Sequence, residues 1–231
     1  MERDVLRYDL HMHSKYSKDS FNEPKLMILQ AVRMGLNGIA VTDHGSIKGG
    51  LKACEELRKL KSRGRVPDDF EVVAGEEVMT DAGEVLAYYI QDEIPKVPLE
   101  EALDRIKEQN GIASIAHPYS RGVIRKAFTA DIEKVLKKHK LDALEGFNAR
   151  IVLDGGNRKA QQLATKHNLA MTAGSDAHFL SEIGRGYVEF KELPGGLREA
   201  VKKKATIPKG SNRLAFFYRS ITLANVLRKK I

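Results

Sequence analysis

The chain has 231 residues, 42% of them hydrophobic and 30% charged, which is typical of a globular protein with a buried core. Its net charge of +8 raises the question of an acidic partner, whereas no apolar stretch approaches the roughly 20 residues of a membrane-spanning helix. The acidic start at residues 1–4 argues against a signal peptide and the single cysteine, Cys54, excludes an internal disulfide, so we expect a cytoplasmic protein.

Short apolar runs alternate with longer segments of helical periodicity along most of the chain. We predict strands near 6–10, 38–42, 71–75, 85–90, 112–116, 142–145, 169–173 and 186–190, the fourth as an antiparallel hairpin return. We predict helices at 24–35, 47–60, 98–109, 131–139 and 154–167. Strands that alternate with helices predict an α/β fold with a mainly parallel sheet and helices outside it.

The basic charge lies mostly in the last part of the chain. Residues 198–231 hold ten Lys or Arg and one Glu, which leaves 29 basic and 30 acidic residues in 1–197. We therefore treat 1–200 as a single domain and 201–231 as a basic extension, whose apolar residues from 211 to 231 recur at helical spacing. Three roles for this extension stay open: a helix packed on the domain, a track for RNA or single-stranded DNA, and attachment to an anionic membrane surface.

Histidines gather where the predicted strands end. Five of the seven lie at or just past an apolar run, and residues two apart on a strand, such as His11 and His13, face the same side. Imidazole nitrogens and carboxylate oxygens together are the usual ligands of hydrolytic metal sites. The candidate ligands are His11, His13, Asp19, His44, Glu77, His117, Asp176 and His178. Because they follow nearly every strand, a closed barrel with its site at one end is favoured over an open sheet.

The order of these motifs resembles the PHP (polymerase and histidinol phosphatase) family of metal-dependent phosphoesterases, in its stand-alone form. The matching segments are 9–14 with 17–19, 41–44, 75–78, 116–118 and 174–178. They read Asp-Leu-His-Met-His-Ser with Ser-Lys-Asp, Val-Thr-Asp-His, Gly-Glu-Glu-Val, Ala-His-Pro and Gly-Ser-Asp-Ala-His. The resemblance implies a distorted (β/α)7, TIM-like barrel of the PHP type, with two or three divalent metal ions (Zn²⁺, Mn²⁺ or Fe²⁺) at the C-terminal ends of its strands.

The resemblance also implies how the ligands divide among the ions. One ion would be held by His11, His13, Glu77 and Asp176, a second by His117 with Glu77 as the bridge, and a third by Asp19, His44 and His178. We take Glu77, Asp176 and His117 as the catalytic residues. Many members place a further His or Cys where this chain has Asn148, and an amide oxygen is a poor zinc ligand, so we expect the second ion to be weakly held.

The expected reaction is hydrolysis of phosphate mono- or diesters of a nucleotide or small phosphorylated metabolite by metal-activated water. Arg121, Arg150 and Arg185 follow ligand motifs and are the predicted contacts to the substrate phosphate. Two alternatives stay open. One is an exonuclease on RNA or single-stranded DNA, with the basic extension as its track; the other is a non-catalytic PHP-like subunit of a nucleic-acid-processing complex. The sequence does not indicate an oligomeric state.

Overall fold

The computed structural model describes residues 5–120, 128, 131–152 and 155–228. Its strands are β1 (Val5–Asp9), β2 (Gly38–His44), β3 (Glu71–Met79), β4 (Glu84–Tyr88), β5 (Ile112–Ile115), β6 (Ala143–Asn148), β7 (Ala170–Gly174), β8 (Gly186–Lys191) and β9 (Ile207–Gly210). Its helices are α1 (Pro24–Arg33), α2 (Lys48–Lys61), α3 (Leu99–Glu108), α4 (Ile132–Lys138), α5 (Gly155–Lys166), α6 (Gly196–Lys202) and α7 (Ala215–Arg228).

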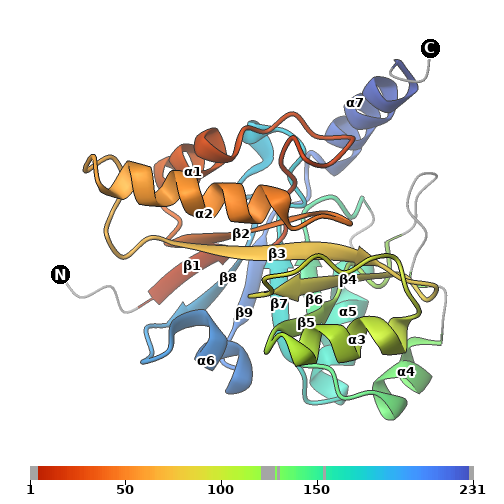
Figure 1. Cartoon of the computed structure of the whole chain (residues 1–231). Helices are drawn as coiled ribbons and strands as arrows, with labels where there is room; N and C mark the ends of the chain where they lie inside the picture. Colours follow the sequence, from red (N-terminus) through yellow and green to blue (C-terminus); the bar gives the residue numbers. More distant parts are fainter. Residues whose placement is uncertain (1–4, 121–127, 129–130, 153–154, 229–231) are drawn as a thin grey trace.

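The strands form one sheet in the order β7-β6-β5-β4-β3-β2-β1-β8-β9. β1, β2 and β3 run parallel, as do β5, β6 and β7, whereas β4 runs antiparallel to both of its neighbours. The chain beyond β1 meets β7: the Leu10 amide donates to the Ala173 carbonyl (3.0 Å), and Met12 bridges to Ala177. The sheet therefore curls into a nearly closed barrel, with α1 and α2 over one side and α3, α4 and α5 over another (Figure 1).

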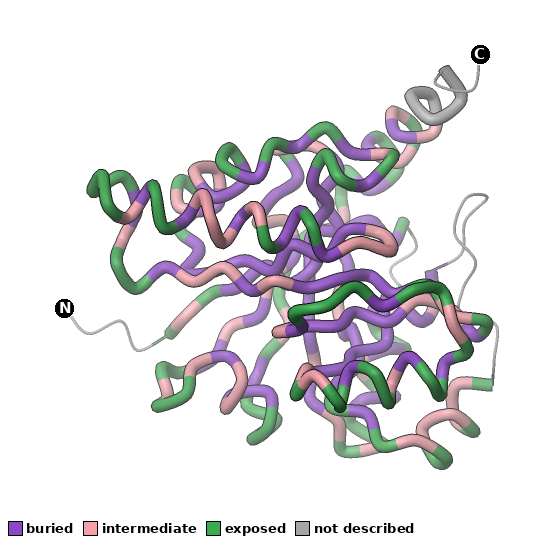
Figure 2. The backbone as a smooth tube through the Cα atoms, viewed as in Figure 1, coloured by how far each residue is buried: buried purple, intermediate pink, exposed green. Residues whose placement is uncertain are grey.

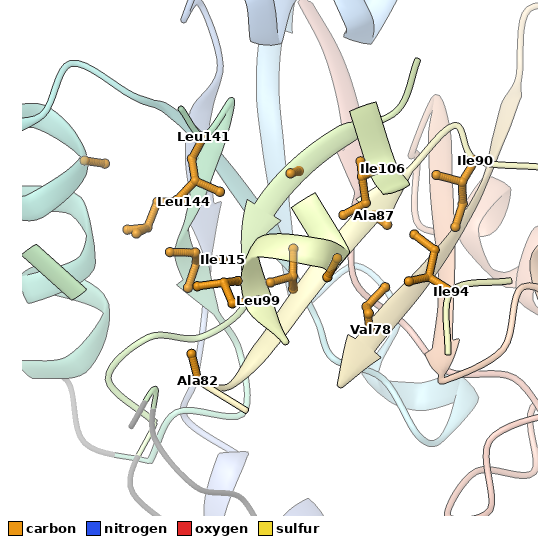
Figure 3. Packing of buried hydrophobic residues seen from close by; sticks show 14 of the residues in the cluster. Val78, Ala82, Ala87, Ile90, Ile94, Leu99, Ile106, Ile115, Leu141 and Leu144 are labelled. Atoms are coloured by element: carbon orange, nitrogen blue, oxygen red, sulfur yellow. The ribbon is translucent and has the colours of Figure 1, made fainter. Parts of the chain in front are cut away.

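Alternation along the strands divides the apolar side chains between the barrel interior and the outer helices. The interior cluster contains residues from β1 through β8 together with Leu197 and Val201 of α6. Outside, Leu99 and Ile106 of α3 pack against the sheet, as Figure 3 shows. The central strands β2 to β7 are accordingly buried along most of their length, whereas β9 is not, and the helices expose their outer faces (Figure 2).

The predicted strands and the helices predicted up to residue 167 are confirmed, with ends shifted by a few residues. Three elements were not predicted: α6, β9 and a one-turn 3-10 helix, η1 (Leu180–Glu182). β9 contains Pro208, which has no N–H to donate and is tolerated here because β9 ends the sheet order beside β8. The predicted domain boundary at 200 falls inside α6, and β9 beyond it belongs to the sheet. Among the described residues, no helix has both the length and the apolar character to cross a bilayer.

Glu76 is a buried carboxylate on the outer face of β3. Its Oε2 accepts a hydrogen bond from the Ile94 amide (2.9 Å), and burial raises the pKa of Glu76 from 4.5 to about 7. The folded chain thus binds this proton more tightly than the unfolded chain does. The contribution of Glu76 to the free energy of unfolding should therefore fall as pH rises from 4.5 to about 7 and then stay level.

We expect Glu76→Gln to remove this pH dependence, because glutamine keeps an acceptor for Ile94 but carries no charge. At about pH 8 the variant should be more stable than wild type by about 3 kcal/mol, and the difference should vanish near pH 4. Urea unfolding at both pH values, with chelator present, measures the effect. An identical pH dependence in the two proteins would contradict it.

Candidate metal centre

Glu77 lies on the interior face of β3, directly opposite His44 of β2 in the parallel register. Val73 packs inside the barrel, and the two-residue period of the strand puts Glu77 on the same face near the strand's end. The remaining predicted ligands lie just beyond β1, β5 and β7, or in the loop that follows β1: His11, His13, Asp19, His117, Asp176 and His178. Parallel strands bring all of these ends to one edge of the barrel.

Each carboxylate oxygen of Glu77 faces a different pair of imidazoles. Oε1 lies 2.9 Å from His117 Nε2 and 3.4 Å from His11 Nε2. Oε2 lies 2.7 Å from His44 Nδ1 and 3.5 Å from His13 Nε2. One fully buried carboxylate therefore joins two halves of the cluster, which is the geometry that a bridging ligand requires.

Two aspartates occupy the two sides of this core. Asp176 Oδ1 lies 3.2 Å from His13 Nε2 and 3.8 Å from His11 Nε2. Asp19 Oδ2 lies 3.0 Å from His178 Nε2 and 3.6 Å from His44 Nε2. The structure thus brings all eight sequence-predicted ligands into one connected cluster.

Glu145 of β6 lies behind the cluster and holds two of its histidines. Its Oε1 is 2.9 Å from His11 Nδ1, and its Oε2 accepts a hydrogen bond from the His117 amide (2.6 Å). With Nδ1 donating to this carboxylate, His11 Nε2 is the nitrogen that faces Glu77 and that would bind a metal ion in the neutral ring. A metal ligand needs that tautomer, and a carboxylate behind the imidazole is its usual support.

Ser17 orients a second imidazole. Its Oγ lies 3.2 Å from His13 Nδ1 and donates to Asp43 Oδ1 (2.8 Å). The same Oγ accepts a hydrogen bond from the His44 amide (3.0 Å). Asp43, directly before a predicted ligand, thus acts on His13 through a serine and does not reach the centre itself.

The backbone is strained at two of the predicted ligands. His117 has φ 23° and Asp176 has φ 55°, values that residues with a side chain rarely adopt and that concentrate at functional sites. Nearby, β7 passes so close to β1 that a Cβ on Gly174 would collide with the Cβ of His11. Glycine at this position therefore allows the two ligand-bearing segments to meet.

The buried charges in the cluster hold one another in place. Burial alone would raise the pKa of Glu77, but the surrounding imidazoles, led by His11, hold it well below its usual range. Burial alone would lower the pKa of His11, but carboxylates led by Glu145 raise it well above the ordinary value. By contrast, burial and two neighbouring imidazoles lower the pKa of His13, which favours the neutral, metal-binding form.

The donor set fits divalent metal ions. Within the described part of the chain, the buried Nε2 atoms of His11 and His13 have no hydrogen-bond partner. Four trios have donor atoms within 4.8 Å of one another: His11, His13 and Glu77; His11, His117 and Asp176; His13, His44 and His178; and His44, Glu77 and Glu84. Ligands bound about 2.0–2.2 Å from one ion lie about 3–3.6 Å apart, close to the 2.7–3.8 Å between the neighbouring donor atoms described above.

Asn148, where the sequence departs from the family pattern, ends β6 beside the cluster. Its Nδ2 donates to Asp176 Oδ2 (3.2 Å) and to both carboxylate oxygens of Glu145 (3.3 and 3.2 Å). Its Oδ1 accepts a hydrogen bond from the Arg150 amide (2.9 Å). Both ends of the amide group are therefore engaged, and Asn148 holds two carboxylates in position.

Arg150, a predicted phosphate contact, is buried. Its guanidinium donates to Glu182 Oε1 (2.8 Å) and Thr222 Oγ1 (2.6 Å), and Nη1 lies 2.9 Å from His178 Nδ1. Arg150 thereby ties α7 to a predicted ligand. A substrate phosphate would have to displace one of these partners.

The other two predicted phosphate contacts differ in their surroundings. Arg185 donates to the Ser181 carbonyl (3.2 Å) and lies over the ring of Tyr218 in α7 (5.3 Å from its centroid). Arg121 lies outside the described residues.

Two carboxylates at the centre were not predicted. Glu145 could have been found from the sequence, because a charged residue inside an apolar strand indicates a functional or paired carboxylate. Glu84 lies 3.4 Å from His117 Nε2 through its Oε2. It begins β4, and because β4 is antiparallel its first residue lies where the parallel strands end. A search of strand ends alone misses it.

Comparison with known proteins identifies the family. A sequence model described as PHP-associated (PHP_C) matches residues 155–206. Uncharacterized protein MJ0417 of Methanocaldococcus jannaschii is 32% identical over 191 residues, which are 81% of this chain and 72% of that protein. The chain belongs to the PHP family.

Two further matches share less of this chain or less of its sequence. A DNA-directed DNA polymerase of Bacillus phage SPbeta is 31% identical over 111 residues, which are 46% of this chain but 7% of the polymerase. The crystal structure of a candidate metal-dependent phosphoesterase from Bifidobacterium adolescentis matches with a TM-score of 0.60 at 17% identity. The match covers 74% of this chain and 87% of that one and shows a shared barrel fold.

We expect Glu145→Gln to weaken metal binding by about 10–100-fold, because His11 would lose the carboxylate that orients it. Titration with Zn²⁺ in competition with a chelator measures the affinity. Glu71→Gln is the control, since it also loses hydrogen bonds, to Tyr8 and Tyr89, but at the opposite end of β3. Unchanged affinity in Glu145→Gln would refute the orienting role.

Proposed function

We propose that this PHP protein is a metal-dependent phosphoesterase that hydrolyses phosphate mono- or diesters of a nucleotide or a small phosphorylated metabolite. The observation that carries the proposal is the bridging geometry of Glu77, whose two oxygens face separate pairs of imidazoles. Hydrolytic sites with two ions are built around such a shared carboxylate.

Two or three ions would be held by His11, His13, Asp19, His44, Glu77, His117, Asp176 and His178. Bound Zn²⁺, Mn²⁺ or Fe²⁺ would supply Lewis acidity toward phosphoryl oxygens and lower the pKa of a water molecule. The chain itself supplies position: Glu77, Asp176 and His117, the proposed catalytic residues, are buried, and the apolar interior beneath them excludes water.

Exposure indicates where a substrate would enter. The side chains of His11 and Glu77 are fully buried, whereas those of His44, Asp19 and Glu84 are each about one fifth exposed. We therefore place the phosphate ester on the side of these three residues. The phosphoesterase described for the Bifidobacterium adolescentis structure supports the reaction class through its shared fold.

We expect Glu77→Gln to lose bound metal and phosphoesterase activity together, because a neutral amide cannot bridge two cations or balance the imidazoles around it. Metal content by mass spectrometry and turnover of aryl phosphate mono- and diesters, with Mn²⁺ and Zn²⁺ supplied separately, measure both losses. Glu76→Gln is the matched control, since it changes the preceding residue on the opposite face of β3.

Full metal content with full turnover in Glu77→Gln would overturn the bridging assignment. If the wild-type protein binds no divalent ion, the alternative of a non-catalytic PHP-like subunit of a nucleic-acid-processing complex is favoured instead. The gathering of eight ligand residues in one cluster argues against that alternative.

A second candidate function is exonuclease activity on RNA or single-stranded DNA. Two aromatic side chains of α7, Phe216 and Phe217, are 73% and 57% exposed, and α7 is joined to the site through Arg150. Exposed aromatic rings stack on unpaired bases. The lysines at 202 and 204 instead line a cleft with Asn110 and Asn168, which precede β5 and β7, so they lie at the opposite end of the barrel.

If α7 guides a strand, we expect the double variant Phe216→Ala/Phe217→Ala to lose about 10-fold in activity on short oligonucleotides, because stacking of each base contributes about 1–3 kcal/mol. Turnover of aryl phosphate esters should be unchanged. Leu51→Ala, an exposed apolar residue on α2, is the control. Equal activity of variant and wild type on both substrate classes would exclude the nuclease role of α7.

A further inference from the structure

Glu84 is a carboxylate for which the family resemblance provides no role. It is the first residue of β4, and it shares the interior face of that strand with Leu86 and Tyr88, both of which pack inside the barrel. Its partner in the antiparallel register is Met79, the C-terminal residue of β3. The topology thus delivers Glu84 to the same rim of the barrel as the predicted ligands.

The contacts of Glu84 are those of a ligand. Its Oε2 lies 3.4 Å from His117 Nε2, which is itself 2.9 Å from Glu77 Oε1. A carboxylate oxygen of Glu84 also lies within 4.8 Å of the donor atoms of His44 and Glu77. Donors that share one ion at about 2.0–2.2 Å are separated by about 3–3.6 Å. The 3.4 Å between Glu84 Oε2 and His117 Nε2 lies in this range, and Glu77 Oε1 lies 2.9 Å from the same imidazole nitrogen.

This position is also the one that lacks a ligand. The side chain at 148, which the family pattern would use with His117, is an amide whose oxygen accepts from Arg150 and whose nitrogen donates to Glu145 and Asp176. Its oxygen is engaged by a hydrogen bond and its nitrogen carries the donated hydrogens, so this amide is a poor metal ligand. Without a further group, the ion beside His117 would have two protein ligands.

We propose that Glu84 is the missing ligand, so that Glu77, Glu84 and His117 hold the second ion. The inference rests on the proposed metal centre and specifies its composition. Two carboxylates and one imidazole form a harder ligand set than one with an additional imidazole or thiolate, and hard oxygen ligands suit Mn²⁺. The second position is therefore selective for Mn²⁺ over Zn²⁺ relative to a centre with His at 148.

The test is a titration of metal-free protein with Mn²⁺, in which free Mn²⁺ is followed by electron paramagnetic resonance and bound metal by mass spectrometry. We expect Glu84→Gln to bind one ion fewer per chain than wild type, or to bind that ion at least about 10-fold more weakly. Glu189→Gln, which removes an ion-paired carboxylate from β8, should bind as wild type does. Circular dichroism with chelator present verifies that each variant is folded.

A second variant separates ligation from a general effect of charge. Glu84→His offers an imidazole in the same place, and we expect it to recover the lost ion with Zn²⁺ in preference to Mn²⁺. Equal Mn²⁺ stoichiometry and affinity in wild type and Glu84→Gln would overturn the ligand role and leave the proposed function standing. A wild-type chain that binds no ion would overturn both.

Discussion

Glu77 carries a negative charge where water does not reach, and such a charge is costly unless neighbouring groups balance it. Its balance comes from imidazoles that belong to segments far apart in the chain: His11 after β1, His44 in β2 and His117 after β5. The charge can be compensated only when these segments lie together. The closed barrel is therefore the arrangement that brings the site together.

Because the strands run in mixed directions, the rim of the barrel carries residues from both kinds of strand end. Parallel strands contribute residues from their C-terminal ends, and β4, which runs against them, contributes one from its N-terminal end. Residues from behind the rim then fix the imidazoles: Glu145 from β6 and Ser17 from the loop after β1. The centre thus has an outer ring of hydrogen-bonded supports as well as a ring of donors.

Much of this arrangement could be predicted from sequence, because its signals are local. A histidine after an apolar run, as at His44 or His117, marks both a strand and its functional end. The ordered motifs also identified the PHP barrel. Glu84 could not be found by the same rule, since it precedes its strand, and β9 was missed because Pro208 in a four-residue strand resembles a turn.

Side-chain partnerships were harder to predict than element positions. The sequence indicates that Arg150 is near the site but not that Glu182 and Thr222 occupy its donors, because those residues are 32 and 72 positions away. Similarly, the engagement of Asn148 by Glu145 and Asp176 depends on the packing of two strands. Contacts of this kind follow from closure of the barrel and carry no local pattern.

The link through Arg150 has a thermodynamic consequence. One guanidinium contacts both His178 of the cluster and Thr222 of α7, the helix that extends from the barrel (Figure 1). Two sites that share a rigid intermediary are coupled, and coupling of equilibria is reciprocal. If metal binding at His178 changes the free energy of α7 docking, then α7 docking changes the free energy of metal binding by the same amount. Arg150 is the residue through which α7 and the predicted ligand His178 are in contact.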